Sequence, residues 1–483
     1  MQSSRSIGPV PPSTRIPMLI GGTWTHGTDE YDVIDPYRGE RVCRAPLSSA
    51  ADLDRALVAA VTAAPTMADM PALERAAILR RAADLVGERA RELADTMARE
   101  MGKAVKDGLA EVARCVTTLR LSAEEAVRIE GEHVPLNSSA MGNGRMAFLL
   151  RFPLGVVAAI TPFNAPINLA CHKVAPALAA GNAVVLKAPP QCPAVIHRFV
   201  ECLVEAGVPS GALNVLYGAN VGPALVQDPR VDFITFTGST RAGALVRAAA
   251  GLRRVALELG GLGSTIVHED ADVALAASLC ANHAMRLAGQ SCISVQNVYV
   301  HRDVYAAFLE LAIAGVGRLV VGDPLDEKTD VGPVVDENAA ARIEAAIAGA
   351  ISGGARLRAG GKRDGALVEP TILTDVTPEM TVACEEIFGP VLTVRAYTDI
   401  DDVMREISES RHGLQAGIFT RSLDVAFRAV RRLRVGGVIV NGTSTWRTDQ
   451  LAFGGVKDSG MGREGPKYAI REMTEQRVVV FNI

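Results

Sequence analysis

The sequence predicts an α/β protein with a doubly wound parallel sheet, a second α/β domain and a small β ribbon. Short apolar runs alternate with helical stretches between residues 152 and 258, and a second alternating segment runs from 261 to about 440. Such alternation is typical of βαβ units, which build parallel sheets. Residues 131–150 lack helical periodicity and contain Asn143-Gly144, a hairpin signal. This stretch predicts the ribbon.

The composition, net charge and cysteine spacing of the chain exclude several classes of protein. The chain has 483 residues, of which 48% are hydrophobic and 22% charged, so it can bury a large core over about three domains. A net charge of −4 gives no basic field for nucleic acid, and no apolar run approaches the ~18 residues that span a bilayer. Eight scattered cysteines without CxxC spacing, and no HExxH, predict a cytoplasmic protein without a metal site. Residues 1–14, rich in Ser and Pro, are expected to form a loose tail.

Short strands and turns are expected near residues 20–24 and 35–36. From residue 48 to 130, Ala, Leu and Arg recur with helical period, which predicts several amphipathic helices interrupted at Pro65 and Pro71. In the first alternating segment we expect strands at 155–160, 183–186, 213–217, 233–236 and 254–257, and helices at 169–180, 194–205 and 242–250. Ligands of such a sheet bind beyond the carboxyl ends of its strands.

The GxGxxG fingerprint is absent, so a dinucleotide site cannot be inferred from it. Residues 218–222 and 236–240 offer glycine turns instead, and the second of these runs from a strand into a helix start. The backbone N–H groups and the helix dipole there suit a pyrophosphate. Ser239 could equally be an ordinary N-cap.

In the second segment we expect strands at 265–267, 295–300 and 438–440, helices at 305–311, 339–348 and 425–433, and a loop at 385–390. The last residues, 477–483, predict one β-branched strand. A terminal strand needs an edge to pair with. We therefore expect it to join a neighbouring subunit's sheet, in a homodimer or homotetramer.

Cys292 is the candidate nucleophile. A helical run, 273–287, leads into a Gly-Gln turn and then the thiol, which places the sulfur on a loop held by a rigid element. Most free cysteines are inert packing residues. The surrounding motifs argue otherwise for Cys292, because Glu258, 34 positions upstream, offers a proton acceptor.

Six short motifs occur in one order: Thr161-Pro162-Phe163-Asn164, Leu186-Lys187, Phe236-Thr237-Gly238-Ser239, Leu257-Glu258-Leu259-Gly260-Gly261, Gly289-Gln290-Ser291-Cys292 and Glu386-Ile387-Phe388-Gly389-Pro390. Together with residues 452–460 they resemble the NAD(P)-dependent aldehyde dehydrogenase superfamily over nearly the whole chain. The resemblance implies a dinucleotide-binding domain (1–124 and 148–258), a catalytic domain (259–458) and an oligomerisation segment (125–147 and 470–483).

The resemblance implies three catalytic residues. The Cys292 thiol would attack the aldehyde, and Glu258 would accept its proton. The Asn164 side-chain amide and the Cys292 backbone N–H would bind the oxyanion. The implied path is a thiohemiacetal, hydride transfer to NAD(P) and Glu258-assisted hydrolysis of the thioester. In the alternative reading, Asn164 caps a helix and Glu258 is a buried ion-pair partner.

The resemblance also implies a cofactor site for NAD or NADP. Lys187 and Glu386 would hold the two riboses, Ser239 the pyrophosphate, and the remaining residues would line the cleft: Thr161, Pro162, Phe163, Gly238, Gly260 and Phe388. Many NAD-preferring members carry a glutamate three residues after this lysine, and here that position is Pro190. The preference between NAD and NADP therefore stays open. Leu262 stands where the family has a lysine, and we have no functional account of that change.

The residues matching the substrate tunnel are unusually polar: Asn168, His172, Arg286, Ser291, Ile293, Arg447 and Phe453, with Arg114 and Arg120 near its mouth. In members that oxidise apolar aldehydes these walls are apolar or aromatic. Two unpaired arginines would be costly, whereas an anion would match the guanidinium fork. We therefore expect the branch that acts on small anionic aldehydes: phosphono-aldehydes, glyceraldehyde 3-phosphate or a semialdehyde. Alternatively, Arg286 pairs with a carboxylate such as Glu111.

Three rival functions are weighed against this one. A CoA-acylating semialdehyde dehydrogenase would use the same thiol, but such members usually lack the general-base glutamate, so Glu258 opposes that interpretation. A non-catalytic binding protein on this fold would not need Cys292, Glu258 and Asn164 together. A cysteine protease lacks a convincing histidine partner.

Overall fold

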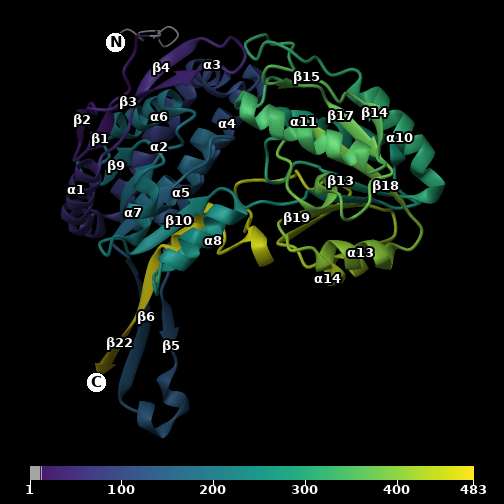
Figure 1. The fold of residues 1–483 in the computed structure, drawn as a ribbon. Coiled ribbons are helices and arrows are strands. Elements are labelled where there is room, and N and C mark those ends of the chain that lie inside the picture. Colours follow the sequence, from purple (N-terminus) through teal and green to yellow (C-terminus); the bar gives the residue numbers. More distant parts are fainter. Residues whose placement is uncertain (1–10, 12) are drawn as a thin grey trace.

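A computed structural model describes residues 11 and 13–483; the expected tail at residues 1–14 lies mostly outside them. The molecule has two lobes, each built on a sheet, and a ribbon that projects from the first lobe (Figure 1). No single helix among the described residues is long and apolar enough to cross a membrane; helices α1 and α2 would qualify only as a pair, and they meet at 114°.

The first sheet has eight strands in the order β2-β1-β9-β8-β7-β10-β11-β21. These are β1 (Met18–Ile20), β2 (Thr23–Thr25), β7 (Val156–Ile160), β8 (Ala183–Lys187), β9 (Leu213–Leu216), β10 (Phe233–Thr237), β11 (Arg254–Glu258) and β21 (Gly460–Met461). From β9 to β11 the strands are parallel. The chain runs from β7 to one side and then returns through β10 on the other, so the strand order reverses between β7 and β10. The five strands predicted here are confirmed.

Helices cover this sheet: α1 (Ala50–Asp69), α2 (Ala72–Glu88), α3 (Ala90–Met101), α4 (Val105–Ala126), α5 (Pro166–Ala180), α6 (Pro193–Ala206), α7 (Val221–Gln227) and α8 (Thr240–Ala249). The expected interruption at Pro65 is wrong, because that residue lies inside α1. Pro71 does separate α1 from α2. A separate hairpin, β3 (Glu30–Ile34) and β4 (Arg41–Pro46), precedes α1.

The second sheet has seven strands in the order β14-β17-β18-β13-β12-β19-β20. Its strands are β12 (Ser264–Val267), β13 (Asn297–His301), β14 (Arg356–Ala359), β17 (Thr371–Thr374), β18 (Val391–Tyr397), β19 (Gln415–Phe419) and β20 (Gly437–Val440), with a small hairpin of β15 (Arg363–Asp364) and β16 (Leu367–Val368). Its helices are α9 (Val273–Met285), α10 (Arg302–Val316), α11 (Glu337–Ser352), α12 (Thr381–Cys384), α13 (Ile400–Glu409) and α14 (Leu423–Arg432). Residues 385–390 form the predicted loop.

The ribbon is a three-stranded sheet of β5 (Glu132–Val134), β6 (Arg145–Pro153) and the terminal strand β22 (Thr474–Asn482), which follows α15 (Pro466–Glu472). Strand β22 pairs antiparallel with β6 over its full length. The chain's own β6 thus supplies one pairing edge for β22, which is the outer strand of this sheet, and its joining a neighbouring subunit's sheet stays a prediction.

Two helix starts in the first lobe are capped by buried carboxylates from other helices. The carboxylate of Glu111 in α4 accepts the backbone N–H groups of Ile167 and Asn168 at the start of α5, at 2.9 and 3.0 Å. Glu100 in α3 does the same for Ala194 and Val195 of α6. Both helices begin with proline and lack a side-chain cap of their own, so these carboxylates satisfy exposed donors at the positive helix ends.

Candidate active site

The loop that carries Cys292 is conformationally strained. Helix α9 ends at Met285, two residues before the predicted end, and a 3₁₀ segment follows. Leu287 and Ala288 have φ values of 56° and 51°, and Gly289 has 71°. Consecutive non-glycine residues in the left-handed region are costly and usually mark functional sites. At Gly289 an added Cβ would collide with the carbonyl of Gly389, so the 385–390 loop fixes this turn.

The Cys292 thiol lies half-buried beside Ile293, Leu414 and Phe453. Burial raises its pKa to about 12, and the Glu386 and Glu258 carboxylates add to the effect. Of the other seven cysteines, six are buried and only Cys384 is partly exposed. Cys292 is partly exposed and has two carboxylates nearby, whereas Cys43, which also contacts a carboxylate, that of Glu100, is fully buried.

Glu258 ends strand β11 and is buried, with one carboxylate oxygen, Oε2, unpaired within the described residues. Burial, reinforced by the Glu464 charge, raises its pKa well above the usual range. It forms no ion pair with any residue that the structure describes, so the ion-pair alternative is not supported. An added Cβ at Gly261 would lie 2.7 Å from the Cys292 carbonyl oxygen, so the chain just after Glu258 packs directly on the nucleophile loop.

Asn164 is buried between β7 and α5. The alternative that it caps α5 is wrong, because Ala165 occupies the cap position and the first helical N–H groups donate to Glu111. The Asn164 amide is therefore not used to terminate the helix. It lies on the same edge of the first sheet as Glu258, since both follow the carboxyl ends of parallel strands.

The predicted cofactor residues gather at the carboxyl ends of three neighbouring strands, β8, β7 and β10. Lys187 ends β8 and is buried, and its side-chain ammonium makes no hydrogen bond or ion pair within the described chain; burial lowers its pKa to about 8. The Oγ1 atoms of Thr161 and Thr237 are also buried and unpaired among described residues. An amine and two hydroxyls without partners, where the strand order reverses, fit a hydroxyl-rich dinucleotide.

The glycine turn at residues 238–239 makes two hydrogen bonds within the protein. Ser239 accepts the backbone N–H of Ala242 at 3.2 Å, so it is the N-cap of α8, as the alternative interpretation held. Gly238 precedes it, and its backbone N–H donates to the Glu258 carbonyl. These contacts leave the pyrophosphate role of this turn as a proposal.

Glu386, from the second lobe, contacts the chain segment that follows Glu258. Its Oε1 accepts the backbone N–H of Gly261 at 3.3 Å, and burial raises its pKa to about 7. A side chain at Gly260 would collide with this carboxylate. The rings of Phe163 and Phe388 meet edge to face with centroids 5.9 Å apart, and Pro162 lies between Thr161 and Phe163 in the first lobe. The predicted cofactor residues of the two lobes thus come together.

The predicted tunnel residue Arg447 is buried in a chain of charges. Its Nη2 lies 3.1 Å from Glu464 Oε2 and 3.2 Å from His172 Nε2. Its guanidinium carbon sits 3.8 Å from the centre of the Phe453 ring. On the far side, Asp449 Oδ1 lies 2.9 Å from His172 Nε2 and 2.6 Å from Arg114. Arg447, His172, Arg114 and Phe453 are therefore assembled in one cluster.

Other predicted substrate residues lie elsewhere or are engaged. Arg286 pairs with Asp107 at 2.7 Å and not with Glu111, which binds Lys103. Arg120 is exposed and pairs with Asp84 of α2 at 3.1 Å. Asn168 lies on α5 and accepts a hydrogen bond from Thr118 at 3.1 Å. Ser291 and Ile293 flank the nucleophile in the chain.

Sequence reasoning missed Asp449, Glu464 and Lys173. Lys173 pairs with Glu464 at 2.9 Å, and both side chains are buried. Burial alone would raise the pKa of Glu464, but the positive charges of Lys173 and Arg447 hold that pKa below its usual range. A lysine inside α5, a helix of mostly apolar residues, was the one available signal, because a buried charge rarely lacks a partner.

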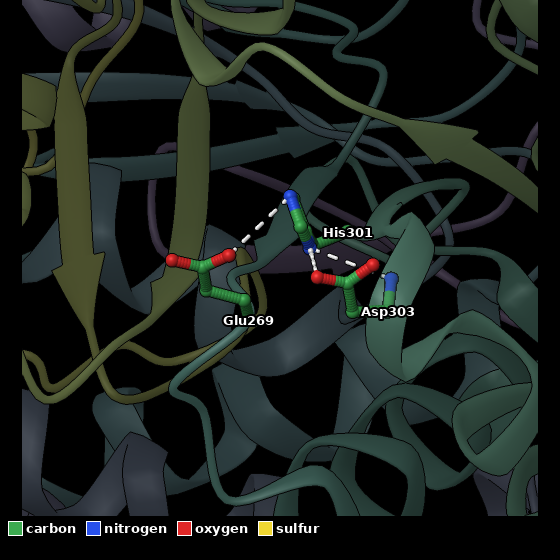
Figure 2. A group of neighbouring side chains, drawn as sticks. All are labelled: Glu269, His301 and Asp303. Carbon is green, nitrogen blue, oxygen red and sulfur yellow. Dashed lines mark hydrogen bonds and ion pairs between the residues drawn. The ribbon is translucent and has the colours of Figure 1, made fainter.

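A further group of titratable side chains lies at the carboxyl end of β13, in the second sheet. Figure 2 shows Glu269 and Asp303 on either side of His301, with ligand atoms within 4.8 Å of one another. His301 Nδ1 accepts the Asp303 backbone N–H at 3.4 Å, and Nε2 lies 3.6 Å from Glu269. Nδ1 is thus engaged in capping α10, while Nε2 faces the Glu269 carboxylate. Cys292 precedes β13, whereas His301 ends it, so this group lies away from the cleft.

Known proteins resemble the whole chain. The aldehyde dehydrogenase family model matches residues 24–479. A 3-sulfolactaldehyde dehydrogenase of Priestia megaterium is 46% identical over 468 residues, covering 96% of this chain and 98% of that protein. A sulfoacetaldehyde dehydrogenase of Neptuniibacter caesariensis is 36% identical, covering 94% of this chain and 100% of that protein.

Solved structures agree. Aldehyde dehydrogenase 21 of Physcomitrella patens, in complex with the reaction product succinate, superposes with a TM-score of 0.94 at 38% identity, covering 97% of this chain and 98% of that one. The NADP-dependent glyceraldehyde-3-phosphate dehydrogenase of Bacillus halodurans, complexed with NADP, gives 0.94 at 37% identity, covering 97% and 100%. The chain has the aldehyde dehydrogenase fold and belongs to the aldehyde dehydrogenase family.

Proposed function

We propose that this protein oxidises a small anionic aldehyde to the carboxylic acid, with NAD or NADP as hydride acceptor. One observation carries the proposal: the Arg447 guanidinium, on a side chain that is 7% exposed, lies 3.8 Å from the centre of the Phe453 ring, against which Cys292 packs. Its positive charge opposes the rise in the pKa of Glu258 and Cys292. A fixed cation beside a nucleophile and a base suits a substrate that bears an aldehyde at one end and an anion at the other.

The chain's own residues supply the acid–base chemistry. Glu258, with its free Oε2, takes the proton of the Cys292 thiol, and the sulfur adds to the aldehyde carbon. The Asn164 amide and the Cys292 backbone N–H donate to the resulting oxyanion, and one such donor contributes ~10²–10³ in rate. The nicotinamide, when bound, supplies hydride acceptance. Glu258 then deprotonates the water that hydrolyses the thioester on Cys292.

Arg447 has donors to spare for an anion. Its protein carboxylate partner is Glu464, reached by a single Nη2 contact, and its Nε is buried without a partner among the described residues. The relatives' names point to sulfonate tails, and the structural neighbours to phosphate and to the dicarboxylate succinate. These anions share the tetrahedral or planar oxygen geometry that a guanidinium binds.

A substrate panel tests this function. We expect the wild-type kcat/KM for sulfoacetaldehyde, glyceraldehyde 3-phosphate or succinate semialdehyde to exceed that for propanal. Arg447→Ala should remove about 2–5 kcal/mol of this preference, the effect of truncating one partner of a buried charge pair. Arg286→Ala, which removes a half-exposed arginine paired with Asp107, is the matched control and should change the ratio little. Equal turnover of propanal and the charged aldehydes by wild type would refute anion selection.

Product analysis separates this function from acylation of CoA. With Glu258 in place, the free acid should form at the same rate with and without CoA. An acyl-CoA product would instead assign the chain to the CoA-dependent group.

We also propose a homodimer or homotetramer assembled through the ribbon. Strand β22 exposes Val478, Val480 and Phe481, with 65%, 48% and 53% of their surfaces accessible. Apolar side chains repeated along an edge strand are typical of an interface.

A further inference from the structure

One ring nitrogen of His172 lies within hydrogen-bonding distance of two groups that it cannot bind at the same time. This atom, Nε2, lies 2.9 Å from Asp449 Oδ1 and 3.2 Å from Arg447 Nη2. A neutral imidazole nitrogen either donates or accepts, and a guanidinium only donates. Nε2 therefore serves one neighbour at a time. We assign its proton toward Asp449, because the carboxylate is closer and a charged acceptor forms the stronger bond.

With the proton on Nε2, two buried polar atoms are left without partners. His172 Nδ1 has none among the described residues, and neither does Arg447 Nε. The side chain of His172 is fully buried, and that of Arg447 is 7% exposed. An unmet buried donor or acceptor costs roughly 1–3 kcal/mol. Two such atoms on side chains in contact, in the cluster beside Cys292, mark a place where a ligand can supply the missing hydrogen-bond partners.

This inference rests on the proposed function. We infer that the anion of the substrate binds His172 and Arg447 together, and that His172 takes up one proton from solvent on Nδ1 as the anion binds. The Nε2 proton stays on Nε2 and remains hydrogen-bonded to Asp449. In the complex, Nδ1–H donates to the anion, so the imidazolium lies between two negative groups. Arg447 contributes its unused Nε donor to the same anion.

The charges around His172 set the direction of this coupling. Arg447, Asp449 and Glu464 face it, and Arg114 of α4 faces Asp449. Burial first, and then the Arg447 charge, lower the pKa of His172 in the free protein, so the ring is neutral at neutral pH. A bound anion favours the cationic form and raises that pKa. Affinity is therefore highest below the free-state pKa and falls as pH rises, until the pKa of the complex is passed.

The pH dependence of inhibition by ethanesulfonate measures this coupling. The sulfonate does not titrate in the working range, and the molecule has neither an aldehyde nor a carboxylate to disturb Glu258. Its Ki against sulfoacetaldehyde oxidation should rise as the pH rises from below the pKa of free His172, which is lower than 6.5, to above the pKa of the complex. Each unit by which the anion raises that pKa corresponds to an increase of about tenfold in Ki over this whole range. His172→Asn and His172→Gln keep a polar side chain that does not titrate, and both should give a flat profile.

His268→Asn is the matched control, because His268 is a partly buried histidine at the far edge of the second sheet whose pKa burial also lowers. It should retain the wild-type slope. A flat wild-type profile, or an unchanged slope in both His172 variants, would overturn the inference while sulfoacetaldehyde oxidation continued. If the wild-type protein showed no preference for sulfoacetaldehyde over propanal, the proposed function would be overturned instead.

Discussion

At the scale of single residues, the free protein keeps its nucleophile protonated. Burial, Glu386 and Glu258 raise the pKa of Cys292 to about 12, and Arg447 is the cation that opposes them. Since only the thiolate attacks, the reactive form is scarce until a neighbouring charge changes. Glu386 is the group best placed to change, because it belongs to the predicted cofactor site. A ligand that draws this carboxylate away lowers the pKa of Cys292.

Glu386→Gln should therefore speed the alkylation of Cys292. Removing one negative neighbour favours the thiolate and lowers the thiol pKa, by roughly half to one unit, which gives a three- to tenfold faster reaction at pH 8. Mass spectrometry of the iodoacetamide-labelled peptide measures the rate. In wild type the rate should keep rising above pH 9, since the thiol pKa is about 12. The half-exposed Cys384 is the internal control, and a slower or unchanged rate at Cys292 contradicts the assignment.

Pro190 bears on cofactor choice. It lies in the turn after β8, three residues beyond Lys187, and offers no carboxylate to repel a 2′-phosphate. We expect NADP to be used with a kcat/KM at least comparable to that of NAD. Pro190→Glu should weaken NADP by about tenfold or more through like-charge repulsion, with NAD changed less. Steady-state kinetics with both cofactors decides this, and an equal effect on NAD and NADP would show that the substitution only perturbs the turn.

At the scale of elements, a buried ion pair anchors the helix that follows Asn164. Lys103 and Glu111 pair with almost no exposure, and Glu111 also receives the first N–H groups of α5. Helix α5 carries His172 and Lys173 as well. The ion pair thus holds one wall of the active site in register with the first sheet.

Glu111→Ala should destabilise the protein by about 3–5 kcal/mol, because it leaves the Lys103 charge buried and unpaired. The double variant Lys103→Met, Glu111→Leu removes both charges and should recover part of that loss. Thermal unfolding of the two variants measures the difference. If the single variant were as stable as wild type, the capping role of Glu111 would be wrong.

Elements were predictable from sequence where local signals suffice. Apolar β-branched runs bounded by turns predicted β7, β8 and β10 closely. Two predicted helix boundaries were wrong for local reasons. Pro65 is accommodated within α1, and α9 ends early because a left-handed turn follows it. The proposed catalytic residues belong to continuous motifs, so the sequence alone was enough to propose them. The partners of the arginines could not, because Arg447 meets His172 across 275 positions and nothing local encodes that contact.

At the scale of the whole molecule, the two lobes meet along the cleft and are joined again by ion pairs away from it. Arg38 pairs with Asp323 at 2.5 Å and Arg91 with Glu327 at 2.7 Å, each linking the first lobe to the loop after α10. The ribbon stands apart from both lobes (Figure 1). Its exposed apolar strand is the feature that a single copy of the chain leaves uncovered.

The variant Val478→Asp, Val480→Asp should weaken assembly. Charges on the exposed face of β22 cannot be buried without a partner, so light scattering should show a smaller particle than the expected wild-type dimer or tetramer. Arg477→Asp, on the same strand and already polar, serves as the control and should assemble normally. A wild-type monomer at micromolar concentration would contradict assembly through the ribbon.

Trapping the covalent intermediate tests the central claim most directly. Wild-type protein, mixed with sulfoacetaldehyde and NADP and quenched with acid within the first turnover, should hold the oxidised substrate on Cys292, because oxidation precedes hydrolysis of the thioester. Intact-protein and peptide mass spectrometry should then find the sulfoacetyl group on Cys292 as a thioester. An unmodified Cys292, or an adduct on another cysteine while NADPH still accumulates, would contradict the account.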